Sequence, residues 1–158
     1  MFRRLTAAFL LTACSLSFAQ PANVLTVTPP PPFKAKAGTT VEARLPIEMQ
    51  AGYHVNSNMP LDQYLIPLRL TWDKGVLEPV GVEFPKPVVE KYQAPGTPAT
   101  TISVFTGKFE VVSKFKVPAD AKQGPTTITG KLRYQACNNV MCLQPKNLDV
   151  ALQVDVIR

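Results

Sequence analysis

Two cysteines near the C-terminus are the residues of this chain best suited to chemistry. Cys137 and Cys142 are separated by four residues, within the run Tyr-Gln-Ala-Cys-Asn-Asn-Val-Met-Cys-Leu-Gln-Pro-Lys at 134–146. Two thiols this close in sequence can form a structural disulfide, exchange a disulfide with another protein, or contribute to a metal site. One other cysteine, Cys14, lies near the start of the chain.

A metal site is a poor explanation for the cysteine pair. Zinc normally takes four ligands from Cys, His or carboxylate side chains, and the sequence has no second pair at metal-ligand spacing. His54 is the single histidine. We therefore expect no metal and no other cofactor.

A structural clamp and an exchangeable pair both remain open. In the chain-entropy model, closing a loop of roughly six residues stabilises the fold by about 2 kcal/mol. A domain with a complete β-core depends little on that amount. A short loop near the surface is also a place where a disulfide is open to exchange. The spacing alone does not separate the two interpretations.

Alternating residues on both sides of the pair predict the elements that hold it. Apolar and polar residues alternate over 127–134 and again over 148–156, which is the pattern of half-buried strands. The cysteines are therefore expected in or beside a tight connection between two strands, close to the surface.

The same period of two recurs along the chain and predicts an all-β fold. No window shows a sustained helical stripe, and the 16 prolines disfavour long helices. Short strands separated by turn residues predict an immunoglobulin-like antiparallel β-sandwich as a single domain. Residues 85–101 show no periodic pattern and are expected to form a loop. The expected core faces comprise Val41, Ala43, Leu45, Ile47 and Met49; Leu68, Leu70 and Trp72; Val80, Val82 and Phe84; and Phe109, Val111, Phe115 and Val117, the last set on one strand over 105–117.

The first nineteen residues have the layout of a signal peptide. A basic start at 1–4 and an apolar run at 5–11 precede the small-x-Ala cleavage site at 17–19. An alternative is a lipobox at 11–14 with a lipidated Cys14, and only then do we expect membrane association. Cleavage after residue 19 removes Cys14 and leaves an even pair in a periplasmic or other extracytoplasmic compartment, where disulfides persist.

Residues 20–38 are expected to be an N-terminal extension with a Pro-rich spacer, and 39–158 the sandwich domain. Four consecutive prolines at 29–32 favour a stiff, extended conformation. Loss of two arginines with the signal peptide lowers the net charge from +6 to +4. The remaining cations are scattered singly, with no basic run interleaved with aromatic residues, so we expect no nucleic-acid partner.

The cysteine run resembles the signature of the N-terminal domain of the thiol:disulfide interchange protein DsbD. That family carries Tyr-Gln-x-Cys, a short loop and Cys-x-x-Pro between its last strands. The segment Gly-Tyr-His-Val-Asn-Ser at 52–57 resembles the family's Gly-aromatic segment after an early strand. The resemblance extends from Thr39 to Val156 and implies the same immunoglobulin-like fold.

The resemblance implies thiol–disulfide interchange. It gives Cys142 the role of forming mixed disulfides with partners and Cys137 the role of the resolving thiol. This chain has four residues between the cysteines, whereas the best-known member of the family has five. Full-length DsbD also contains a membrane-embedded electron carrier and a thioredoxin-like domain. This sequence contains neither, so we expect a separate thioredoxin-like or membrane-embedded electron donor, with oxidised exported proteins as acceptors.

A loop with aromatic and acidic residues caps the cysteines in the DsbD domain, and the matching region here is the Pro- and Gly-rich segment after Phe84 that contains residues 90–96. Tyr92 and Glu90 are therefore candidates for a cap, with Tyr53 and His54 as further candidates for partner contact. A mobile surface loop and a merely structural histidine are the simpler alternatives.

Three cations near the pair, Lys131, Arg133 and Lys146, are positioned in sequence to favour a thiolate. For the whole protein two other functions stay open. One is a non-catalytic immunoglobulin-like binding or scaffolding module whose disulfide pins a hairpin. The other is a lipid-anchored envelope protein that uses the sandwich for assembly.

Overall fold

The computed structural model describes residues 23–93 and 95–158. The predicted signal peptide, with its cleavage site and Cys14, lies outside the described residues. The described part is built of strands and turns without a helix, and so contains no helix that could span a membrane.

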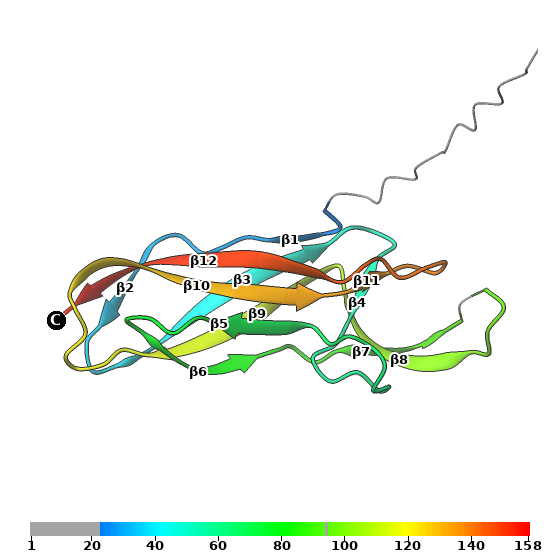
Figure 1. Ribbon diagram of the computed structural model, residues 1–158, viewed down its shortest axis with the longest axis horizontal. Helices are drawn as coiled ribbons and strands as arrows, with labels where there is room; N and C mark the ends of the chain where they lie inside the picture. The colour runs from blue at the N-terminus through cyan, green and yellow to red at the C-terminus, as the bar shows by residue number, and fades with distance from the viewer. Residues whose placement is uncertain (1–22, 94) are drawn as a thin grey trace, which may run out of the picture.

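The strands form three four-stranded sheets (Figure 1). The first sheet has the order β1 (Leu25–Val27), β3 (Thr40–Met49), β9 (Lys108–Lys116), β6 (Glu78–Glu83). The second has the order β2 (Phe33–Lys36), β12 (Lys146–Ile157), β10 (Gly124–Tyr134), β5 (Arg69–Trp72). The third has the order β11 (Ala136–Cys137), β4 (His54–Asn56), β8 (Thr100–Thr106), β7 (Val88–Tyr92).

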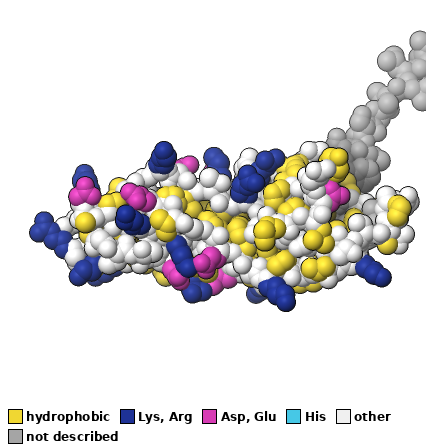
Figure 2. All heavy atoms as spheres, turned by 90° about the horizontal axis from the view of Figure 1, so that it is seen from below, with side chains coloured by type: hydrophobic (Ala, Val, Ile, Leu, Met, Phe, Trp, Pro, Cys, Tyr) yellow, Lys and Arg dark blue, Asp and Glu magenta, His cyan; other side chains and the backbone are white. Residues whose placement is uncertain are grey.

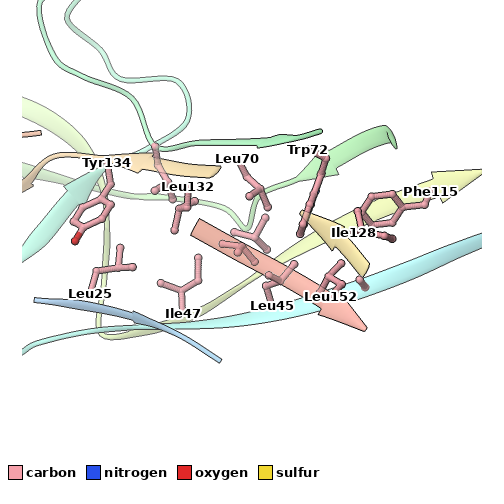
Figure 3. Packing of buried hydrophobic residues seen from close by; sticks show 14 of the residues in the cluster. Leu25, Leu45, Ile47, Leu70, Trp72, Phe115, Ile128, Leu132, Tyr134 and Leu152 are labelled. Carbon is pink, nitrogen blue, oxygen red and sulfur yellow. The ribbon is translucent and has the colours of Figure 1, made fainter. Parts of the chain in front are cut away.

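The first and second sheets pack face to face and enclose the core, which confirms the predicted sandwich (Figure 3). From Ala43 on β3, Ile128 on β10 and Val150 on β12, every second residue is buried, because the strand period of two places alternate side chains on the inner face. The predicted faces over 41–49, 68–72 and 109–117 all point inward, with Ser113 as the polar member of the last. Fully burying one such aliphatic or aromatic side chain contributes about 1.5–3 kcal/mol.

Trp72 ties the two layers of the sandwich together. Its indole Nε1–H on β5 donates a hydrogen bond of 2.9 Å to the buried Ser113 hydroxyl on β9. Its ring also makes an edge contact with Phe115, with 5.2 Å between ring centroids. The indole is therefore satisfied and held in one orientation inside the core.

The third sheet is assembled from the ends of strands that belong to the sandwich. The chain passes from β3 into β4 through Gly52 and from β8 into β9 through Gly107, both with positive φ, 83° and 59°. Consequently β4, β8 and β7 repeat the order of β3, β9 and β6, while β11 continues β10 from the second layer. The sheet lies at one end of the molecule, opposite the C-terminus (Figure 1).

Three features differ from the sequence expectations. The strand predicted over 105–117 is broken at Gly107, because a positive φ ends the regular ladder. Residues 85–101 contain β7 and the start of β8 rather than a loop alone. Val80 is 57% exposed, because the β6–β9 register shifts between Pro79 and Gly81 and breaks the alternation.

The stretch predicted as an N-terminal extension contributes two strands to the sandwich. β1 pairs with β3 in the first sheet, whereas β2 pairs with β12 in the second. The four prolines at 29–32 connect them, as expected of residues that cannot join a ladder in mid-sheet. The β2–β12 pairing is parallel, a departure from the otherwise antiparallel ladders among the described strands.

Gly130 generates a prediction about stability. A methyl group at this position would lie 2.6 Å from Trp72 Cε3 and 2.7 Å from the Thr71 carbonyl oxygen. Since neither the held indole nor the backbone can move away freely, Gly130→Ala should destabilise the fold by about 1–3 kcal/mol. Urea denaturation measures this. Gly75→Ala is the matched control, because a methyl there meets nothing within 4 Å; equal midpoints for both variants would contradict the tight contact.

Candidate redox site

The cysteine hairpin is held by backbone pairing and by one side chain. Cys137 and Cys142 stand directly opposite each other as an isolated antiparallel bridge. Hydrogen bonds flank them on both sides, from Asn138 N–H to the Met141 carbonyl at 2.9 Å and from Leu143 N–H to the Ala136 carbonyl at 2.8 Å.

The tip of the hairpin is organised by Asn138. Its Oδ1 accepts hydrogen bonds from the backbone N–H groups of Val140 and Met141, both at 2.9 Å. Asn commonly closes turns through such side-chain-to-backbone bonds. The four-residue loop between the cysteines is therefore an ordered turn.

The two cysteines form a disulfide, with 4.0 Å between their Cα atoms. Their exposure is unequal: Cys137, on β11, is only 2% exposed, whereas Cys142 is exposed. Attack on a disulfide requires the incoming thiolate to reach one particular sulfur. Of the two residues, Cys142 is the one that solvent reaches.

The disulfide borders a small cavity of about 120 Å³. The cavity brings together residues from all four strands of the third sheet and from the loop at 57–68. Its lining is Cys137, Cys142, His54, Asn56, Asp62, Leu65, Tyr92, Thr100, Thr101 and Ile102. We refer to it as the disulfide cavity.

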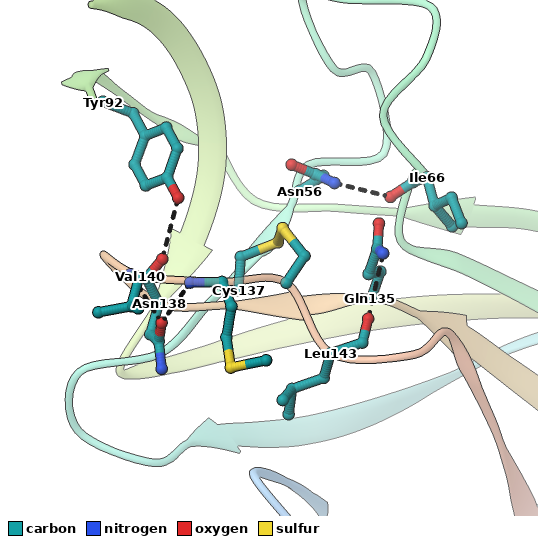
Figure 4. Close-up of a disulfide and its surroundings, with 10 residues drawn as sticks. Asn56, Ile66, Tyr92, Gln135, Cys137, Asn138, Val140 and Leu143 are labelled. Carbon is teal, nitrogen blue, oxygen red and sulfur yellow. Dashed lines mark hydrogen bonds between the residues drawn. A yellow bond between two sulfur atoms is a disulfide. The ribbon is translucent and has the colours of Figure 1, made fainter. Parts of the chain in front are cut away.

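Tyr92 closes one side of the disulfide cavity. The half-buried ring directs its hydroxyl at the cysteine hairpin and donates a hydrogen bond of 3.1 Å to the Asn138 carbonyl (Figure 4). The ring edge also meets His54, with centroids 5.7 Å apart and an interplanar angle of 78°.

The contact between Tyr92 and His54 shows that the β7–β8 hairpin curls over the sheet. Tyr92 on β7 pairs with Thr100 at the start of β8, whereas His54 on β4 pairs with Thr106 at its end. Six residues of a flat strand would separate these positions by roughly 20 Å. The ring contact therefore requires the hairpin to bend back over the cysteines.

His54 is buried, although it is the first residue of β4. It is the direct cross-strand neighbour of Cys137 in the β4–β11 pair and is only 7% exposed. Burial lowers the pKa of its imidazole, and the Glu90 carboxylate offsets part of that shift. Its neutral form is therefore favoured at pH 7.

Glu90 and Tyr53 lie on the other side of His54. Both border a neighbouring hollow that shares His54 with the disulfide cavity, and neither lines the disulfide cavity itself. Four of the six predicted site residues thus line one cavity, namely Cys137, Cys142, Tyr92 and His54. Glu90 and Tyr53 lie outside it, in the neighbouring hollow.

The three cations near the cysteines in sequence do not line the disulfide cavity. Lys131 is instead on the outer face of β10, where its ammonium donates to Asp149 at 2.7 Å. Apart from the cysteines, the ionisable residues of the lining are His54, Asp62 and Tyr92. Among residues 23–93 and 95–158, no group of three His, Cys, Asp or Glu side chains is placed to hold a metal ion.

The loop at 57–68 is a part of the site that the sequence analysis missed, since it contributes Asp62 and Leu65 to the lining. It is anchored at both ends by polar contacts: the buried Ser57 and Ser103 hydroxyls are hydrogen-bonded at 2.9 Å, and the Asn56 side chain donates to the Ile66 carbonyl at 3.0 Å (Figure 4). The Asn-Ser-Asn-Met-Pro composition indicates a turn but not its place beside the cysteines.

Comparison with the structure of a ScsB domain supports the fold. The N-terminal periplasmic domain of ScsB from Proteus mirabilis aligns with a TM-score of 0.53 and 16% identity, over 83% of this chain and 45% of that chain. The Neisseria meningitidis DsbD N-terminal domain in the reduced form aligns with a TM-score of 0.48 and 16% identity, over 75% and 82%. This chain therefore spans less than half of the ScsB structure. A search of curated proteins gives no match.

Comparison with family sequence models identifies the family. The model described as "Thiol:disulfide interchange protein DsbD, N-terminal" matches residues 22–153, which is most of the chain and includes both cysteines, β4 and the β7–β8 hairpin. This chain belongs to the family of DsbD N-terminal domains.

Proposed function

We propose that this protein is an extracytoplasmic electron relay that exchanges its Cys137–Cys142 disulfide with partner proteins. Membership of the family supports thiol–disulfide interchange. The observation that carries the proposal is the unequal exposure of a disulfide beside a cavity, with Cys142 accessible and Cys137 buried. A clamp that only pins a hairpin needs no such access.

The relay runs through two mixed disulfides. A thiolate of a reduced thioredoxin-like donor attacks the Cys142 sulfur, and the Cys137 sulfur leaves and takes up a proton. The second donor thiol then releases Cys142, so that two electrons reside on the pair. The Cys142 thiolate next attacks a disulfide of an oxidised exported protein, and Cys137 resolves the mixed disulfide, restoring the Cys137–Cys142 bond. No cofactor takes part.

Partners are expected to dock on the half of the protein that carries the third sheet. On the face drawn in Figure 2, hydrophobic side chains gather on this half, while most of the visible Asp and Glu side chains lie on the other half. Exposed apolar patches of this kind mark interaction surfaces. The large exposed hydrophobic residues of the third sheet and the adjacent loops are Met59, Leu61, Tyr64, Val88, Val89, Val140 and Met141.

Tyr92 serves as a gate in this proposal. Its hydroxyl bond to Asn138 and its ring over the disulfide cavity restrict the approach of small thiols. The β7–β8 hairpin that carries it is attached to the sheet through β8, while the outer edge of β7 is unpaired. A docking partner therefore displaces the ring by moving one hairpin without disturbing the sandwich.

The proposal also includes export of the protein and removal of its N-terminal segment. Residues 1–19 direct export and are removed, which leaves Cys137 and Cys142 as the two thiols of the mature protein. Lipidation at Cys14 is the alternative that would add a membrane anchor.

Trapping experiments test the direction of attack. Cys137→Ala should accumulate a mixed disulfide with a thioredoxin-like donor through Cys142, whereas Cys142→Ala should accumulate little, because its remaining thiol is buried. Non-reducing gels and intact mass measure the adducts. Both variants should melt cooperatively, since loop closure contributes only about 2 kcal/mol. Loss of cooperative melting in both would favour the structural clamp instead.

The rate of reduction by dithiothreitol tests the gate. Tyr92→Ala should speed reduction several-fold, because it removes both the ring and the hydroxyl bond, and Tyr92→Phe should show the smaller effect of the bond alone. The melting temperature should change little, since Tyr92 is half-buried on an edge strand. Tyr64→Ala is the matched control, a tyrosine 85% exposed in the adjacent loop. An unchanged rate in Tyr92→Ala would remove the gate and leave the relay intact.

A further inference from the structure

His54 is a buried ionisable group that the relay as described does not use. Among the described residues, no hydrogen bond reaches its imidazole, and no buried side-chain nitrogen or oxygen lacks a partner. The ring nitrogens must therefore reach one of the two hollows that His54 borders, the disulfide cavity or the hollow beside Glu90. An imidazole in this state is free to exchange a proton with a group that appears in the cavity.

The group that appears there on reduction is the Cys137 thiol. Cys137 faces His54 directly across the β11–β4 ladder, and both line the disulfide cavity. Directly opposed residues in an antiparallel pair have Cβ atoms about 4.5–5.5 Å apart, which is within reach of contact between an imidazole and a thiol. Burial disfavours the charged form of a thiol, so the resolving step needs a proton acceptor close by.

We propose that His54 is the proton acceptor for Cys137 in the resolution of mixed disulfides. This inference rests on the proposed relay and assigns a role to one more residue of the same site. In the mixed disulfide, Cys142 is bonded to a partner sulfur and Cys137 is a thiol. The imidazole takes the thiol proton, and the Cys137 sulfur attacks the Cys142 sulfur. The bond to the partner breaks, the partner leaves as a thiolate, and the imidazolium returns the proton to it or to solvent.

The charges around His54 suit this role. Glu90 and Tyr92 face it from β7, Asp62 lies in the loop across the disulfide cavity, Tyr53 precedes it, and the neighbouring β8 residue, Thr106, is neutral. Among the described residues, no Lys or Arg lines either hollow. The pKa of His54 is lowered by burial, so the ring is neutral and able to accept a proton at pH 7. It loses that ability as the pH falls through its lowered pKa.

The reaction of the reduced protein with 5,5′-dithiobis(2-nitrobenzoate) isolates the resolving step. In a Cys14→Ser background, attack by Cys142 releases one equivalent of the coloured thiolate at a rate that depends on reagent concentration. Attack by Cys137 then releases a second equivalent in a first-order step. We expect His54→Gln to slow only the second step, by about a hundredfold or more at pH 7, which is the typical contribution of general base catalysis.

The pH profile separates a proton acceptor from a structural residue. The wild-type second step should rise through the lowered pKa of His54 and then level off. In His54→Gln it should keep rising until the thiol ionises unaided, so that the two rates converge above about pH 9.5. Thr106→Val, which alters the cross-strand neighbour of His54 on β8, should keep the wild-type profile. Parallel profiles for wild type and His54→Gln would overturn the assignment.

A measurement on the unaltered histidine covers the case in which His54→Gln does not fold. His54 is the single histidine, so its ¹⁵N resonances are unambiguous. Its titration should differ between the oxidised and reduced protein, because a thiol replaces the disulfide beside it. Identical titration in both states would also overturn the proposal. If the second equivalent is never released, Cys137 does not resolve and the relay itself fails; if it is released equally fast without His54, only this inference fails.

Discussion

The geometry of the site depends on two glycines at which the chain leaves the sandwich. β3 and β9 form one antiparallel ladder that ends at the Glu48–Lys108 pair, and the chain turns away from it at two residues with positive φ, Gly107 before β9 and Gly52 in the turn after β3. The amide N–H of Met49, the last residue of β3, donates a hydrogen bond of 2.8 Å to the Gly107 carbonyl. This bond holds together the two points at which the chain leaves the sandwich. Residues with a β-carbon rarely adopt this conformation. Without it, β4 and β8 would continue the first sheet and would not turn toward the cysteine hairpin.

The third sheet creates an environment in which charge is scarce. Besides the cysteines, the disulfide cavity is lined by two threonines, Asn56, two apolar side chains and three ionisable residues, and no lysine or arginine among the described residues lines it. Thiolates near cations are favoured and reactive. In the proposed relay, reactivity is therefore controlled by access through Tyr92 and by proton transfer through His54, and not by a neighbouring positive charge. Lys131, which is near the cysteines in sequence, pairs instead with Asp149 on the outer face.

The sequence predicts the sandwich and the cysteine hairpin well, because both depend on local patterns. Alternation over 127–134 and 148–156 marks β10 and β12, and Asn138 is a recognisable turn residue. The same reasoning cannot locate the break at Gly107, since apolar residues continue the period of two across it. It also cannot place Asp62 beside the cysteines, or Tyr92 against His54. Both contacts arise from the curl of a hairpin and the anchoring of a loop, which are tertiary effects without a local signature.

Both layers of the sandwich contribute strands to the third sheet, so this sheet depends on the packing of the two layers. β11 continues a strand of the second layer, whereas β4, β8 and β7 continue strands of the first. The two cysteines are near neighbours in sequence and can oxidise in an unfolded chain. Their cavity, their buried histidine and their tyrosine cover, however, exist only after the two layers have packed together. In the proposed export route, a new chain can therefore form its disulfide before the surroundings that make exchange selective exist, and packing of the core completes those surroundings.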